Sequence, residues 1–206
     1  MVSNYPVQFG VDFPVRPLNR VSTAFRLVAA IPIVVLLTML SGLTLNDRDH
    51  NTMNTIVIGG AAVFVPLVLM LVVRQKYPRW WFDWNLNLLR FSNRVTAYLA
   101  LLDDRYPSTD EDQSVHLDFA YPDVHHLNRW LPLVKWFLAI PHYVALFFLG
   151  VGAAGAIVIA WFAIVLTGTY PRALFDYVVG VMRWTNRVNG YAFSLVTDEY
   201  PPFSLR

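Results

Sequence analysis

Two stripes of charged residues could carry chemistry in this chain. Each stripe combines a carboxylate with two arginines, and the two sets are Asp83, Asn87, Arg90, Arg94 and Asp176, Gly180, Arg183, Arg187. Steps of four, three and four residues place each set on one side of a helix. Arginine donates hydrogen bonds to phosphate and pairs with carboxylates, so the stripes could bind an anion. Local Asp–Arg pairs and contacts with lipid phosphate are the simpler explanation.

A second group of donors lies in the segment "VHLDFAYPDVHH". It holds the nitrogen and oxygen ligands that metals use, in His116, Asp118, Asp123, His125 and His126. The spacing fits no metal motif, and no Glu stands where a zinc-helix motif would need one. We expect a solvated linker without a metal or cofactor. A membrane enzyme that acts on lipid through these residues is an alternative.

His142 is a lone ionisable residue within an apolar run. Such a residue is a functional candidate when it lies inside a membrane. Bis-histidine ligation of haem would need a second His at depth, and the other apolar segments supply none. We therefore expect His142 to hydrogen-bond a neighbouring helix or to lie near the membrane interface. The sequence contains no nucleophile elbow, phosphate loop or zinc helix, and no cysteine, which favours a non-enzymatic protein.

The elements that must position these residues are apolar. Of the 206 residues, 56% are hydrophobic and 15% charged, against roughly 25% charged in soluble domains. Four membrane spans are predicted at Leu27–Leu45, Ile56–Val73, Trp130–Leu149 and Ala156–Gly168. The run Gly150–Gly155 is expected to form the turn of the second hairpin, with a re-entrant hairpin as the alternative.

The distribution of Lys and Arg predicts the orientation. Nearly all of them lie before the first span, between the second and third, or after the fourth, and only Arg48 lies in the opposite loop. The positive-inside rule then places both termini in the cytoplasm of a multi-pass protein of the bacterial cytoplasmic (inner) membrane. The net charge of +2 is too small to indicate nucleic acid as a partner.

Repeated strings indicate an internal duplication. "KYPRWWFDWN" at 76–85 returns as "TYPRALFDYV" at 169–178, and "LNR" occurs at 18–20 and 127–129. The expected organisation is an N-terminal cytoplasmic segment (1–17), a first unit (18–107), a polar linker (108–126) and a second unit (127–203). The predicted fold is all-α, with two tandem hairpins of membrane helices, each followed by an amphipathic interfacial helix.

The two interfacial helices supply the candidate binding residues. Their indole rings suit the headgroup level of a bilayer, and their arginines suit anionic phospholipids. The candidates for lipid or partner binding are Arg79, Trp80, Trp81, Asp83, Trp84, Arg90, Arg94, Arg172, Asp176, Arg183, Trp184 and Arg187.

With the repeated "YPRxxFD" strings and the closing "DEYPPFSL", the chain resembles the bacterial membrane family known as domain of unknown function 4389, over about residues 15–203. That resemblance implies a polytopic membrane protein and no particular chemistry. The leading hypothesis is a non-enzymatic accessory or scaffold subunit that docks onto other membrane-protein subunits and anionic phospholipids. The alternative is a small transporter or lipid-handling protein for an anionic substrate.

Overall fold

A computed structural model describes residues 5–14, 17–40, 67–109, 111–123 and 127–206. In chain order the elements are β1 (Val7–Val11), α1 (Arg20–Ala24), α2 (Arg26–Leu40), the short π-helix η1 (Met70–Arg74), α4 (Arg79–Leu99), β2 (Val115–Phe119), the 3₁₀-helix η2 (Leu131–Leu133), α5 (Lys135–Leu138), α6 (Ile140–Thr167) and α7 (Arg172–Ala192).

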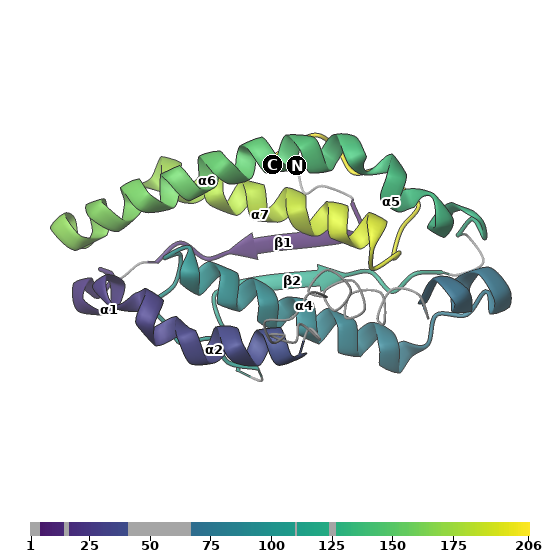
Figure 1. Cartoon of the computed structure of the whole chain (residues 1–206), viewed down its shortest axis with the longest axis horizontal. Helices are drawn as coiled ribbons and strands as arrows, with labels where there is room; N and C mark the ends of the chain where they lie inside the picture. Colours follow the sequence, from purple (N-terminus) through teal and green to yellow (C-terminus); the bar gives the residue numbers. More distant parts are fainter. Residues whose placement is uncertain (1–4, 15–16, 41–66, 110, 124–126) are drawn as a thin grey trace, which may run out of the picture.

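A two-stranded antiparallel ribbon lies at the centre of the molecule (Figure 1). Val7 pairs with Phe119 and Phe9 with Leu117, and all four side chains are buried. The intervening residue Gln8 is exposed, as are His116 and Asp118 on the partner strand. The prediction of an all-α fold is therefore wrong. The ribbon is formed by two short segments in which apolar and polar residues alternate, and β2 occupies part of the expected polar linker.

Helices flank this ribbon on both sides. From top to bottom, Figure 1 shows α6, α7, β1, β2, α4 and α2, with α1 near the far end of α6. β1 contacts α7, and β2 contacts α4. Each strand therefore packs on the long helix from the other half of the chain. α6 covers α7 on the side away from β1.

The predicted third and fourth spans are one helix. α6 runs unbroken for 28 residues through Gly150–Gly155, so neither the hairpin nor the re-entrant alternative forms. A glycine costs about 1 kcal/mol relative to alanine in a helix, which is too little to stop a long apolar segment. Gly152 has a packing role instead, because a Cβ there would lie 2.6 Å from the Tyr177 hydroxyl oxygen.

The four-span prediction is wrong for the described residues. Among them, α6 is the one helix long and apolar enough to cross a membrane, and that is a statement about length and composition alone. α2 covers the beginning of the predicted first span. The expected outer loop and most of Ile56–Val73 lie outside the described residues.

The helices expected after the Tyr-Pro-Arg strings are present as α4 and α7. Each begins directly after a proline, Pro78 or Pro171, whose extended conformation ends the preceding segment. Where the two helices meet, Asn93 and Asn186 exchange amide hydrogen bonds of 2.9 and 2.7 Å. Each amide also donates to the carbonyl four residues earlier in its own helix, Leu89 or Met182. This buried polar pair is fully bonded, so it fixes the register of the two helices at little energetic cost.

The contact between β1 and α7 requires a residue without a side chain at position 190. A Cβ on Gly190 would lie 2.5 Å from Val7 Cγ2. We expect Gly190→Ala to lower the free energy of unfolding by about 1–3 kcal/mol, the usual cost of overpacking. Gly155→Ala is the matched control, since a Cβ there meets nothing within 4 Å. It should raise stability by about 0.5–1 kcal/mol. Equal effects in denaturant titrations would contradict this packing.

Candidate functional site

One arginine from each stripe donates a hydrogen bond to the ribbon. Arg90 Nε donates to Leu117 O at 2.9 Å, and Arg183 Nε donates to Phe9 O at 2.9 Å. Phe9 and Leu117 face each other across the ribbon. Each guanidinium thus binds a carbonyl of the strand that packs on its helix, so one edge carbonyl on each strand has a partner.

The other two arginines bind loop and tail carbonyls. Arg94 Nη1 donates to Ser108 O at 2.8 Å. Arg187 donates to Ser204 O at 3.3 Å and to Arg206 O at 2.5 Å. Burial lowers the pKa of the Arg187 guanidinium, with a smaller contribution from Arg183. All four arginines of the stripes therefore have main-chain partners, and the structure gives them a role inside the fold.

The remaining candidates are mostly exposed. Trp80 and Trp84 have 65% and 44% of their surface accessible, whereas Trp81 lies between them and is half-buried. Asp83 is exposed on the same turn. Arg79 lies over the Tyr121 ring at 4.7 Å. These residues form an aromatic and basic surface at the start of α4.

The equivalent turn of α7 is less aromatic. Arg172 lies over the Phe13 ring at 4.4 Å and 3.9 Å from the Asp176 carboxylate. Trp184, in contrast, is buried. Its indole Nε1 donates to His142 Nδ1 at 3.0 Å. The hydrogen bond to a neighbouring helix that was expected for His142 is therefore present.

His142 lies in an aromatic cage. Its ring stacks on Phe203 with centroids 4.0 Å apart, and Tyr200 lies 4.7 Å away. Because Nδ1 accepts the indole proton, Nε2 carries the hydrogen of the neutral ring. The last residues of the chain thus close over the start of α6, and His142 joins α6 to α7 and to this tail.

Sequence reasoning missed two buried cations. Arg26 and Lys135 both lie six residues after an "LNR" string, and both are almost completely buried. Arg26 donates to Tyr98 O at 3.0 Å and Asp103 O at 2.8 Å and pairs with the Asp104 carboxylate. The repeated spacing could have identified them, but they were counted only among the positive charges that precede, open or flank the predicted spans.

Lys135 occupies a similar setting. Its Nζ donates to Thr197 O at 2.6 Å and lies 2.7 Å from the Asp198 carboxylate and 5.2 Å from the Tyr191 centroid. Burial lowers the pKa of Lys135, and Asp198 opposes that shift. A buried cation of this kind destabilises the fold when its carboxylate partner is removed.

A strained turn presents each of these carboxylates. Leu101 and Leu195 follow the ends of α4 and α7 with φ of 65° and 53°, and both are buried. The next amide in each turn bonds back to the helix, from Leu102 N to Ala97 O and from Val196 N to Gly190 O. A leucine in the left-handed region is uncommon, so its burial must offset the strain.

The donors of the expected linker are dispersed. His116 lies 3.0 Å from Asp12, and Asp118 pairs with Arg90 at 3.3 Å. Over the described part of the chain, no group of three or more possible ligands could hold a metal ion. His125 and His126 lie outside that part.

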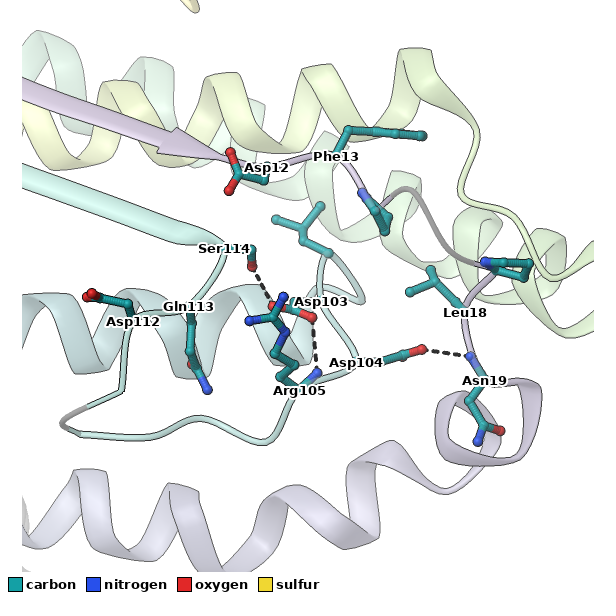
Figure 2. Close-up of a pocket in the computed structure, with 13 residues that line it drawn as sticks. Asp12, Phe13, Leu18, Asn19, Asp103, Asp104, Arg105, Asp112, Gln113 and Ser114 are labelled. Atoms are coloured by element: carbon teal, nitrogen blue, oxygen red, sulfur yellow. Dashed lines mark hydrogen bonds between the residues drawn. The ribbon is translucent and has the colours of Figure 1, made fainter.

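A cavity of about 570 Å³ with both polar and apolar lining residues lies between the end of β1, the start of α1 and the loop before β2. Figure 2 shows Asp12, Asp103, Asp104 and Asp112 around it. Asp103 accepts from Arg105 N at 3.0 Å and from the Ser114 hydroxyl, and Asp104 accepts from Asn19 N at 2.7 Å. Asp103 thus bonds within the loop, and Asp104 joins the loop to the residue before α1.

α6 carries an extended exposed apolar surface. Its buried side is a stripe made of His142, Ala153, Ala156, Ala160 and Ile164. Its other side carries large apolar side chains that are all more than half exposed, namely Val144, Phe147, Phe148, Val151, Val158, Ile159, Phe162 and Leu166. We call this second set the apolar face of α6. Patches of this size on a monomer mark contact with lipid or protein.

Fold and surface together define a mostly helical protein with a small central ribbon and an exposed apolar face on α6. Residues 130–204 match the model of the family described as Domain of unknown function (DUF4389). This confirms the resemblance over the second expected unit, while the duplication itself stays a prediction. Comparisons with curated proteins and with solved structures gave no match.

The buried pair of Lys135 and Asp198 gives a testable prediction. Asp198→Asn should cost about 3 kcal/mol of unfolding free energy, because it leaves a buried lysine without a carboxylate. Asp176→Asn is the matched control, since the exposed Arg172–Asp176 pair contributes less than about 1 kcal/mol.

The cost of Asp198→Asn should shrink as the pH rises toward 10.5, the ordinary pKa of lysine. Below that pH the unfolded chain binds a proton that the folded variant releases, so stability rises with pH. Chemical denaturation at several pH values measures both effects. A cost that stays constant up to pH 10.5 would show that the loss of Asp198 leaves the pKa of Lys135 unchanged.

Proposed function

We propose that this protein is a non-enzymatic accessory or scaffold subunit of a larger assembly in the bacterial cytoplasmic membrane. The apolar face of α6 carries the proposal. Lipid or the apolar surface of a membrane subunit would cover this face, and the exposed indoles of Trp80 and Trp84 on α4, at the other side of the ribbon, would contact a partner subunit.

The energetic size of the face supports this placement. Burying one Val, Leu, Ile or Phe side chain is worth about 1.5–3 kcal/mol, so covering the eight half-exposed residues is worth roughly 10 kcal/mol. A typical domain has a net stability of about 5–15 kcal/mol. The free energy of covering the apolar face of α6 is therefore comparable to the net stability of a whole domain.

The settings of the arginines favour a scaffold over an anion transporter. An anion site would need guanidinium groups that are free to bind substrate. Arg90, Arg94, Arg183 and Arg187 instead donate to carbonyls of the ribbon, the loop and the tail. These arginines therefore link elements of the fold to one another, and they are poorly placed to bind a transported anion.

A pull-down of the tagged chain from native membranes in a mild detergent or in nanodiscs tests the proposal. Mass spectrometry should find other membrane subunits in near-equal amount. Trp80→Ala combined with Trp84→Ala should reduce their recovery at least several-fold, whereas Thr96→Ala, an exposed change on the same helix, should not. Recovery of the chain alone, or with lipid only, would contradict the scaffold role and support a self-contained lipid-handling protein.

A further inference from the structure

We infer that α6 lies along the membrane surface, half-embedded in one lipid leaflet through its apolar face, and does not cross the bilayer. The inference rests on the proposed membrane role and specifies its partner as the lipid leaflet. By length alone α6 could cross, since 28 residues extend about 42 Å. The elements packed against α6 indicate that it lies along the bilayer.

The first argument is the one-sidedness of α6. The buried stripe from His142 to Ile164 faces α7 and α1, and the exposed apolar residues lie opposite. A helix with one covered side and one apolar exposed side can lie flat on an apolar medium, as interfacial helices do. In those helices the polar side belongs to the helix itself, whereas here the rest of the protein supplies it.

The second argument is the polar surface beside the middle of α6. α7 runs back along α6, with Trp184 bonded to His142 and the Tyr177 hydroxyl donating to Leu149 O at 3.0 Å. Leu149 is near the midpoint of α6. Asp176 adjoins Tyr177, and the side chains of Asp176 and Arg172 are 64% and 69% exposed. A crossing α6 would take this exposed ion pair into the hydrocarbon, where charged groups are costly.

The third argument is the direction of the ribbon. In Figure 1 both strands run alongside α6, with α7 between α6 and β1. The side chains of His116 and Asp118 are 64% and 78% exposed. Turning α6 across the bilayer would turn the ribbon with it and bring these groups toward lipid. With α6 in the plane of the leaflet, the ribbon stays in water.

Exposed apolar side chains also lie on the elements next to the two ends of α6. Trp161 Nε1 donates to Thr23 O at 3.2 Å and so ties α1 to this part of α6. Val21 and Phe25, on the α1 segment, are about two-thirds exposed. Before α6, Trp136 and Phe137 of α5 are at least half exposed.

Single cysteines can test the inference directly, because the chain contains none. Leu133→Cys and Thr169→Cys place exposed thiols just before and just after α6. Each variant is probed with a membrane-impermeant maleimide in intact spheroplasts and in inverted membrane vesicles. Gln8→Cys on the ribbon serves as the control for the aqueous side.

The expected result is that all three thiols react from the same side of the membrane. Thiols at 133 and 169 that react from opposite sides would overturn the inference. That second result would leave the scaffold proposal intact, because a crossing α6 would still anchor the protein. Absence of the wild-type chain from washed membranes would overturn both.

Discussion

The structure depends on the hydrogen bonds that two arginines make to the edges of the central ribbon. Arg183 and Arg90 bind Phe9 O and Leu117 O, so each long helix is fixed to a strand from the other half of the chain. A two-stranded ribbon is marginal in isolation, and its edge carbonyls need partners. The guanidinium groups satisfy them, while the Asn93–Asn186 pair fixes one helix against the other.

These contacts between helices and strands keep the apolar face of α6 away from the exposed side chains of the ribbon. With α7 fixed to β1, α6 can pack only on the far side of α7, and its exposed residues then point away from the ribbon. The buried cations Arg26 and Lys135 complete the arrangement by tying the beginnings of α2 and α5 to the turns after α4 and α7. The apolar face of α6 thus lies on the side of α7 away from the ribbon, as the proposed placement on a membrane requires.

The sequence predicted the local features of this fold better than its assembly. The apolar segments, the helices after the Tyr-Pro-Arg strings and the hydrogen-bonded role of His142 could be predicted, because period and composition decide them. The glycine run was misread, since Gly152 serves close packing against Tyr177 and no turn forms there. β1 and β2 were missed although their residues alternate, because five-residue strands carry a weak signal and their partners lie about a hundred residues apart. The arginine stripes were placed on the correct helices, but only tertiary structure shows that they bind backbone.

The measurement that tests the account most directly is the depth of α6 in the bilayer. Nitroxide labels on cysteines at Val144, Val151 and Val158 would lie on the apolar face at seven-residue spacing. Their relative accessibility to oxygen and to a water-soluble nickel complex reports depth. The account predicts nearly equal, shallow depths at all three sites. Depths that differ by about 10 Å between successive labels, as expected for a helix along the membrane normal, would contradict it.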